Sequence, residues 1–225
     1  MPSASVTRGH GLLEGFLARK RCDMANTLIG TGREAGSILD IGCGSYPLFL
    51  EQVNMRRKVG VDQVVDPARQ AHFASRGIEL VARDLDRDPR LPFDDASFDI
   101  VTMLAVFEHV EADKLPLVIR EIHRVLKPGG IYVVTTPASW ADPILTTMSW
   151  LRLVSADEVD EHEETHTLAS MKDAIAGGGF RSEHIETGTF ECGMNLWARA
   201  KKANHHKAAA YAKKERSHVK KVLSS

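Results

Sequence analysis

The sequence has few cysteines and no long apolar run, and both absences limit what the protein can be. Its 225 residues include three cysteines, Cys22, Cys43 and Cys192, an odd number at wide spacing. This pattern predicts neither a disulfide framework nor a Cys-x-x-Cys metal site, so we expect no metal. No stretch approaches the roughly 18 apolar residues that a membrane-spanning helix needs, and the N-terminus lacks the charged-then-apolar layout of a signal peptide. We therefore expect no transmembrane segment and a cytoplasmic location.

The chain also lacks a strong net charge, but its charges are unevenly distributed. The formal net charge is -1, whereas the segment from Lys201 to the end holds eight basic residues and one acidic residue, or +7. The remainder therefore carries -8. A dedicated nucleic-acid-binding domain would carry positive charge on its folded surface, which makes nucleic acid an unexpected partner. The basic tail is interpreted as a solvated, partly helical extension, with docking on anionic lipid or RNA as the alternative.

Apolar runs alternate with helical patterns through most of the chain. Helices are predicted at 12–29, 48–53, 66–77 and 112–127, and another begins at the capping residue Thr167. Strands are predicted at 38–40, 58–61, 78–82, 98–104 and 131–136, followed by two closing strands at 180–187 and 191–200. Such alternation builds a parallel sheet with helices on both faces, and we expect the closing pair to form a hairpin at one edge.

Glycine and acidic residues follow the first predicted strands. Asp40, Gly42 and Gly44 follow the first strand, and Asp62 follows the second, 22 residues after Asp40. In an open α/β sheet ligands bind beyond the carboxyl ends of the strands, and a carboxylate at about this spacing can bind both hydroxyls of a ribose. An adenosine-type ligand is therefore predicted. A dinucleotide loop would have a third glycine where this chain has Pro47, which disfavours an NAD-dependent reductase.

A series of short segments resembles the class I S-adenosylmethionine-dependent methyltransferases, most closely the small-molecule branch that includes ubiquinone-biosynthesis enzymes. The segments, in chain order, are ILDIGCG, VGVD, ARDL, LPFDDASFDIV, EHV and LKPGG. The resemblance covers about residues 36–200. It implies a Rossmann-like three-layer α/β sandwich with a seven-stranded, mostly parallel sheet whose last strand is antiparallel. We expect a methyltransferase domain at 36–200 that contains a substrate lid at 137–166. We expect an N-terminal tail and helix at 1–35 before this domain and the basic tail at 201–225 after it.

The resemblance also implies roles for individual residues. Those expected to contact the cofactor S-adenosylmethionine are Asp40, Gly42, Cys43 and Gly44 at the methionine end, Asp62 at the ribose, Asp84 and Leu85 at the adenine, and Leu104 and Ala105 before the substrate cavity. A carboxylate suits paired hydroxyls, and backbone N–H groups at the start of a helix suit the methionine carboxylate. Tyr46 replaces the third glycine of the family's loop, so it either lines the methionine pocket or crowds it.

The implied reaction moves a methyl group from a sulfonium to an oxygen, nitrogen or carbon nucleophile of a small molecule. The protein mainly aligns the reactants and removes a proton where the acceptor needs it, and His109 is the first candidate for that base. The alternative is that His109 caps a helix or bonds a carbonyl. On the predicted lid we expect Trp140, Trp150, His162 and His166 to face the substrate, with simple packing and a solvated acidic face as the alternatives.

The residues after the fourth strand argue against a nucleobase acceptor. They run from Ala105 to His109 as AVFEH, not as the Asn/Asp-Pro-Pro-Tyr/Phe run typical of relatives that methylate nucleobase amino groups. The second hypothesis is a non-catalytic binding or interaction protein with a methyltransferase fold, motivated by Tyr46 and the basic tail. Acceptor choice depends on the N-terminal helix and on 137–165, which carry no motif that we can decode.

Overall fold

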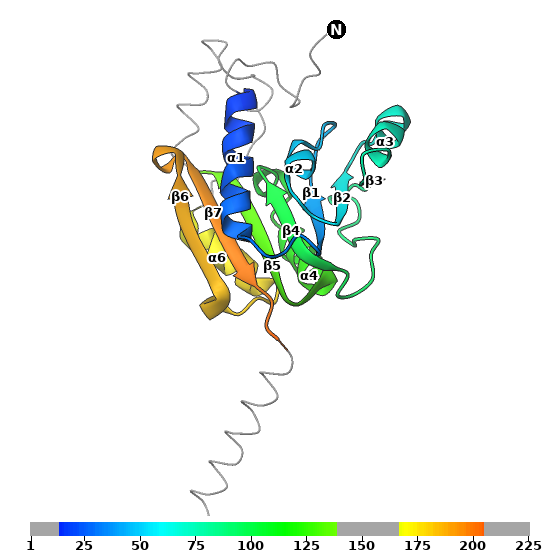
Figure 1. Ribbon diagram of the computed structural model, residues 1–225. Coiled ribbons are helices and arrows are strands. Elements are labelled where there is room, and N and C mark those ends of the chain that lie inside the picture. The colour runs from blue at the N-terminus through cyan, green and yellow to red at the C-terminus, as the bar shows by residue number, and fades with distance from the viewer. Residues whose placement is uncertain (1–13, 139–166, 205–225) are drawn as a thin grey trace, which may run out of the picture.

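A seven-stranded sheet runs through the centre of the molecule (Figure 1). The computed structural model describes residues 14–138 and 167–204. The strands are β1 (Ser37–Ile41), β2 (Arg57–Asp62), β3 (Ile78–Ala82), β4 (Phe98–Leu104), β5 (Leu126–Pro137), β6 (Ile185–Phe190) and β7 (Asn195–Lys201). Their order is β3-β2-β1-β4-β5-β7-β6. β1 to β5 are parallel, and β7 is antiparallel to both of its neighbours. The predicted seven-stranded sheet with an antiparallel last strand is confirmed.

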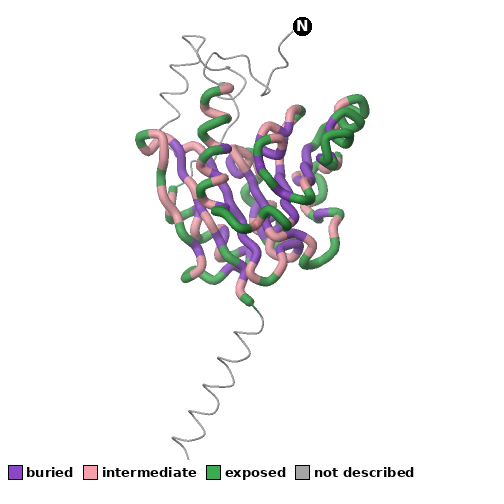
Figure 2. Tube along the Cα trace, viewed as in Figure 1, coloured by how far each residue is buried: buried purple, intermediate pink, exposed green. Residues whose placement is uncertain are grey.

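Helices cover both faces of the sheet, which explains why its central strands are nearly continuous apolar runs. α1 (Glu14–Ile29), α2 (Leu48–Gln52) and α3 (Pro67–Ala74) share one apolar core with one face of the sheet. α4 (Leu115–Val125) and α6 (Leu168–Gly177) share the other core. Alternate residues of β5 enter the two cores, with Ile131 and Val133 in the first and Tyr132 and Val134 in the second. Figure 2 shows the buried residues concentrated in the central strands.

Local sequence signals start two of these helices as predicted. The side chain of Asp66 accepts a hydrogen bond from the Ala68 N–H at 2.7 Å, and Pro67 occupies the first turn of α3. Thr167 caps α6, since its Oγ1 accepts from the Ser170 N–H at 3.1 Å while the Ser170 hydroxyl accepts from the Thr167 N–H. These three hydrogen bonds satisfy N–H groups that have no partner within a helix.

Several boundaries differ from the predicted ones. α4 begins at Leu115 and ends at Val125, because Leu126 turns to extended backbone and pairs with Phe98, so β5 starts five residues earlier than predicted. The closing strands are also displaced: β6 covers 185–190, and β7 begins only after the short 3-10 helix η4 (Glu191–Gly193). In the predicted 180–187 strand, the 3-10 helix η3 (Ser182–His184) occupies the middle.

The predicted N-terminal helix lies against the sheet with one side buried. Cys22, Ala25 and Ile29 of α1 are buried at helical spacing, whereas Phe16 is 50% exposed. The helix contacts β4, β5 and α2, so it lies across the middle of the sheet (Figure 1). None of the described helices combines the length and apolar character needed to cross a membrane.

Candidate functional site

A cavity of about 540 Å³ opens at the carboxyl ends of β1, β2 and β4, next to α1. The predicted residues that line it are Asp40, Gly42, Cys43, Gly44, Tyr46, Asp62, Leu85, Leu104, Ala105 and His109. These residues come from separate strand ends, and the parallel sheet brings them to one edge because the carboxyl ends of its strands point the same way. The cavity is therefore the place where the predicted cofactor residues meet.

The glycine loop after β1 is shaped by close packing and by a hydrogen bond to β2. Gly42 has φ +69°, and a Cβ added there would lie 2.2 Å from Cγ2 of Val106. Gly44 has φ +71°, and its N–H donates to Oδ2 of Asp62 at 2.8 Å. Side chains at both positions are disfavoured, at Gly42 by the Val106 clash and at both by the left-handed backbone. The loop therefore presents bare backbone to the cavity and is tied to the carboxylate predicted to bind ribose.

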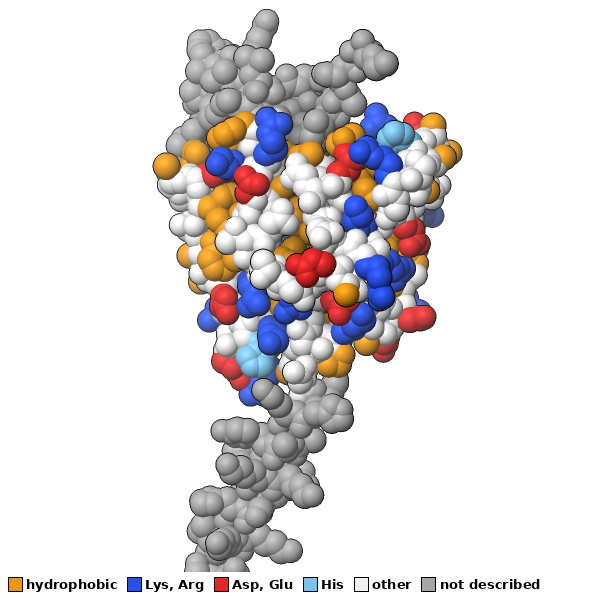
Figure 3. All heavy atoms as spheres, viewed as in Figure 1, with side chains coloured by type: hydrophobic (Ala, Val, Ile, Leu, Met, Phe, Trp, Pro, Cys, Tyr) orange, Lys and Arg blue, Asp and Glu red, His pale blue; other side chains and the backbone are white. Residues whose placement is uncertain are grey.

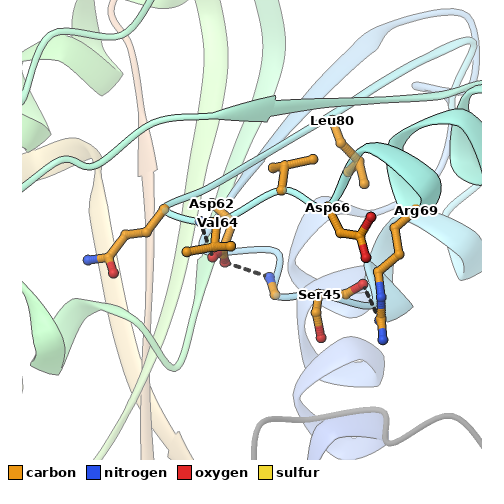
Figure 4. Close-up of a pocket in the computed structure, with 9 residues that line it drawn as sticks. Ser45, Asp62, Val64, Asp66, Arg69 and Leu80 are labelled. Carbon is orange, nitrogen blue, oxygen red and sulfur yellow. Dashed lines mark hydrogen bonds between the residues drawn. The ribbon is translucent and has the colours of Figure 1, made fainter.

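A second, smaller cavity of about 270 Å³ adjoins the larger one at Asp62, and Figure 4 shows residues that line it. It shares Gly44, Asp62 and Gln63 with the larger cavity, and its further lining includes Val64 and Arg69. The Arg69 guanidinium donates to the Ser45 carbonyl at 2.8 Å and so links α3 to the glycine loop. The two cavities meet at Asp62, which gives an extended ligand room to occupy both next to this carboxylate.

Asp40 and Asp62 are both buried beside the glycine loop. Asp40 is 4% exposed, and its Oδ1 accepts from the Thr102 hydroxyl at 2.6 Å. Burial raises the pKa of Asp40 from 3.8 to about 7; the Thr102 hydrogen bond opposes this shift and the negative charge of Asp62 adds to it. The cavity wall thus holds two carboxylates close enough to repel one another, an arrangement that favours a ligand with a positive group at this end.

Tyr46 lies in the wall of the larger cavity, and other side chains hold it there. Its ring packs edge-on against Phe73 of α3, with 5.5 Å between the ring centres. Its hydroxyl donates to Glu51 of α2, and Glu51 also pairs with Arg76. These contacts direct the hydroxyl toward α2 and α3. Of the two predicted possibilities, the arrangement favours lining of the pocket over crowding.

The predicted adenine pair is divided. Leu85 is buried and lines the cavity. Asp84 is exposed and stands outside the lining; its Oδ1 accepts from the N–H groups of Asp86 and Arg87 at 3.1 and 3.2 Å. Asp84 therefore shapes the turn that carries Leu85, and any contact with the adenine stays a prediction.

His109 stands at the rim of the cavity, five residues after the end of β4. It is the last residue of the 3-10 helix η1 (Phe107–His109), where it is exposed and lines the cavity. Its neighbour Glu108 is only 8% exposed. Burial raises the pKa of Glu108, and the charges of His109 and Arg21 oppose that shift. The predicted base thus faces the cavity beside a buried carboxyl group that the site prediction did not include.

Some predicted residues cannot be placed and others were missed. Trp140, Trp150, His162 and His166, with nearly all of the predicted lid, lie outside the described residues. The cavity lining also includes Ala18, Arg21 and Cys22 of α1; the sequence prediction linked the N-terminal helix to acceptor choice but named none of these residues. The 3.6-residue period places these three positions together, next to the buried Ala25, and could have indicated them.

The cavity suits the adenosine-type ligand that the sequence predicts. Gly42 and Gly44 leave backbone exposed, a buried carboxylate lies where two cavities meet, and Leu85 supplies an apolar wall. This combination of backbone N–H groups, a carboxylate for hydroxyls and an apolar surface matches the three chemical parts of an amino-acid-bearing nucleoside.

Comparison with known proteins agrees with this description. Residues 39–134 match the family model described as a methyltransferase domain. The demethylmenaquinone methyltransferase of Symbiobacterium thermophilum is 37% identical over 108 residues, which cover 45% of this chain and 42% of that protein. The tRNA N(3)-methylcytidine methyltransferase of Schizosaccharomyces pombe is 32% identical over 109 residues, 42% of this chain and 34% of that protein. The chain thus spans less than half the length of these curated relatives.

The fold has solved counterparts as well. The crystal structure of an S-adenosylmethionine-dependent methyltransferase from Thermotoga maritima, described as a possible histamine N-methyltransferase, superposes with a TM-score of 0.62 at 17% identity. The match covers 85% of this chain and 91% of that one. At this identity the likeness concerns the fold alone.

Proposed function

Because residues 39–134 form a methyltransferase domain of the class I family, whose members use S-adenosylmethionine, we propose that this chain methylates a small molecule. The acceptor atom would be an oxygen, nitrogen or carbon nucleophile. The observation that carries the proposal is the cavity itself, in which the glycine loop and two buried carboxylates lie together at the carboxyl ends of β1 and β2.

Each part of the cavity has a proposed role in holding the cofactor. Asp62 would bind the ribose hydroxyls, since it lies where the two cavities meet. Asp40 and the backbone of Gly42 and Gly44 would hold the amino-acid end, where the carboxylate of Asp40 suits the ammonium group. Leu85 would cover the adenine. When bound, S-adenosylmethionine supplies a methyl group that is already strongly electrophilic.

The chain's own residues would orient the reactants and accept a proton. An acceptor with an O–H or N–H group loses that proton on methylation, so a base must stand near the reacting atom. His109 lies on the cavity rim after β4 and is the proposed base. Leu104 and Ala105 would close the wall beside the methyl group and exclude water, which keeps the reactants in contact.

A small molecule is the proposed acceptor class. The chain lacks the Asn/Asp-Pro-Pro-Tyr/Phe run after β4, and on the face shown in Figure 3 basic and acidic side chains of the described residues are interspersed. A nucleic-acid surface would instead gather positive charge on the folded domain. The methyl-acceptor classes named for the relatives include a quinone precursor and a tRNA, so the choice between these classes is tested directly.

Cofactor binding is tested by isothermal titration calorimetry with S-adenosylhomocysteine. We expect a dissociation constant of about 1–100 μM, the range of ordinary enzyme ligands, and a rise in Tm on binding. NADH is the matched control and should give neither signal. If millimolar S-adenosylhomocysteine produces no heat and no change in Tm, the proposal is wrong.

Acceptor class is tested with methyl-labelled S-adenosylmethionine in a cell extract separated into small-molecule, RNA and protein fractions. Label should enter the small-molecule fraction, and the His109→Ala variant should lower its rate about 100-fold while binding S-adenosylhomocysteine normally. Label confined to RNA or protein would contradict a small-molecule acceptor. Full turnover by the variant would remove His109 as the base.

A further inference from the structure

Buried polar atoms without a hydrogen-bond partner gather near the carboxyl ends of β4 and β5. Seven such side-chain atoms occur among the described residues, and native folds leave few buried polar groups unsatisfied. Five of the seven are Nε of Arg21, Oε2 of Glu108, Oγ1 of Thr135, Oγ1 of Thr136 and Oε1 of Glu191. We call these five residues the α1–β5 polar cluster.

The strand register, and the effects of these residues on one another's pKa values, indicate that the members of the α1–β5 polar cluster lie close together. Thr135 pairs with Leu104 at the end of β4, four residues before Glu108. The charge of Arg21 lowers the pKa of both Glu108 and Glu191, and the nearby Thr136 hydroxyl, as a potential donor, also lowers the pKa of Glu108. The cluster therefore spans α1, the ends of β4 and β5, and the turn between β6 and β7.

The β6–β7 turn places Glu191 in the cluster at a conformational cost. Glu191 and Cys192 have φ values of +52° and +57°, a left-handed backbone that non-glycine residues rarely adopt. The Asn195 amide donates to Oε2 of Glu191 at 2.6 Å, and Asn195 pairs with Pro137 at the end of β5. Two strained residues in succession, held by a side-chain hydrogen bond, are typical of positions where function opposes stability.

The cluster also adjoins the larger cavity. Arg21 lines that cavity, and so do Leu104, Ala105 and His109, which flank Glu108 in sequence. Glu108 itself is 8% exposed, and burying a carboxylate with an unpaired oxygen is unfavourable unless a ligand supplies the missing donor. A group bound to the cluster would thus lie beside the place where the cofactor is proposed to bind.

We propose that the α1–β5 polar cluster binds the methyl acceptor, and that it selects a head group with hydrogen-bond donors, either hydroxyl or amino. Four of its five unpaired atoms are oxygens that can accept, and carboxylate oxygens can only accept. Arg21 provides one N–H donor and the two threonine hydroxyls can donate or accept, so the carboxylate oxygens of Glu108 and Glu191 are the atoms for which a ligand would supply donors. This proposal rests on the proposed function, because only a protein that transfers methyl groups has a methyl acceptor.

The first test asks whether the two carboxylates serve the fold or a ligand. The Glu108→Gln and Glu191→Gln variants remove buried charge at nearly constant shape, so Tm of the ligand-free protein should rise by about 2–4 °C for each. Glu186→Gln is the matched control, since its side chain is 65% exposed and pairs with Arg199 at 3.4 Å; its Tm should not change. A fall in Tm for both cluster variants would mean that the carboxylates are structural and would overturn the proposal.

The second test measures ligand-observed NMR binding to protein saturated with S-adenosylhomocysteine. The probes are two matched pairs, catechol with 1,2-dimethoxybenzene and benzylamine with benzyltrimethylammonium, whose second members lack the donors. We expect one donor probe to bind about tenfold more tightly than its methylated partner. A preference in the catechol pair would indicate a hydroxyl head group, and a preference in the benzylamine pair would indicate an amino head group. The Glu108→Gln/Glu191→Gln double variant should lose the preference while its affinity for S-adenosylhomocysteine changes less than about twofold.

Any of three results would overturn the proposal. These are equal binding within both pairs, no binding of either donor probe at millimolar concentration, and a preference that persists in the double variant. Failure of the proposed function gives a different result. In that case S-adenosylhomocysteine does not bind, whereas the same probes still report on the cluster in the ligand-free protein.

Discussion

The two sides of the carboxyl-end surface differ in how their polar groups are satisfied. On the side of β1 and β2, the Gly44 N–H bonds Asp62 and the Thr102 hydroxyl bonds Asp40. On the side of β5 and β7, one carboxylate oxygen of Glu108 and one of Glu191 are buried without a donor. The first side is pre-organised and its polar groups have partners in the protein. The second side has unmet hydrogen-bonding capacity.

This difference fits the separate demands of the two proposed ligands. A cofactor shared by a whole family can be bound by a rigid loop whose shape is set within the protein, which lowers the cost of binding. An acceptor must be distinguished from related molecules, and buried polar groups that only the right ligand can satisfy achieve the strongest discrimination. The comparison therefore predicts that changes on the first side weaken cofactor binding, whereas changes on the second side alter acceptor choice.

The largest expected effect is that of Asp62→Ala on the cofactor side. The change removes a charged acceptor for two hydroxyls, each worth about 1.5–3 kcal/mol as a charge-assisted hydrogen bond, so affinity for S-adenosylhomocysteine should fall at least about 100-fold. Calorimetry measures the loss, and Asp173→Ala, an exposed position on α6, is the control. A loss of less than about threefold would show that Asp62 does not hold the ribose.

The next effect is that of Asp40→Asn, which should weaken the binding of S-adenosylhomocysteine about tenfold by removing the partner of its ammonium group.

The Asp40→Asn variant should also change how the stability of the protein depends on pH. In the fold the pKa of Asp40 is raised from 3.8 to about 7, so between these values the folded protein keeps a proton that the unfolded chain releases. Wild-type stability therefore falls as pH rises through this window, and the charged form is a net cost above pH 7.

The Asp40→Asn variant has no titratable group at this position, so its advantage in Tm over the wild type should grow from pH 4 to pH 8, by about 3–6 °C. Differential scanning fluorimetry across this range checks the prediction. Parallel Tm curves for the two proteins would mean that Asp40 does not titrate between these pH values.

The smallest expected effect is that of Tyr46→Ala, about fivefold on S-adenosylhomocysteine, because the ring forms one wall of the cavity. 5′-Methylthioadenosine lacks the amino-acid end, and its affinity should stay unchanged if Tyr46 acts at that end. Tyr46→Phe, which loses only the bond to Glu51, is the conservative control and should bind both ligands normally. Equal losses for both ligands would indicate a general disturbance of the loop.

Much of the cofactor side could be predicted because its signals are local. The loop from Asp40 to Gly44 and the cap at Asp66 depend on residues that are close in sequence, and backbone conformation and first-turn hydrogen bonds are determined over such distances. Asp84 shows the limit of this approach. Its place after β3 was predicted, whereas its use in a turn with Asp86 and Arg87 follows from side-chain geometry that a motif does not specify.

By itself, the sequence determined the alternation of strands and helices, the strand-end loop and hence the cofactor class, because periodicity and short motifs act within a few residues. Only the tertiary structure brought Arg21, Glu108 and Glu191 to one place and left one polar atom of each without a partner. Hydrogen-bond satisfaction depends on neighbours from distant segments, which no local pattern encodes. For that reason the cofactor side was predictable, and the proposed acceptor side emerged from the fold.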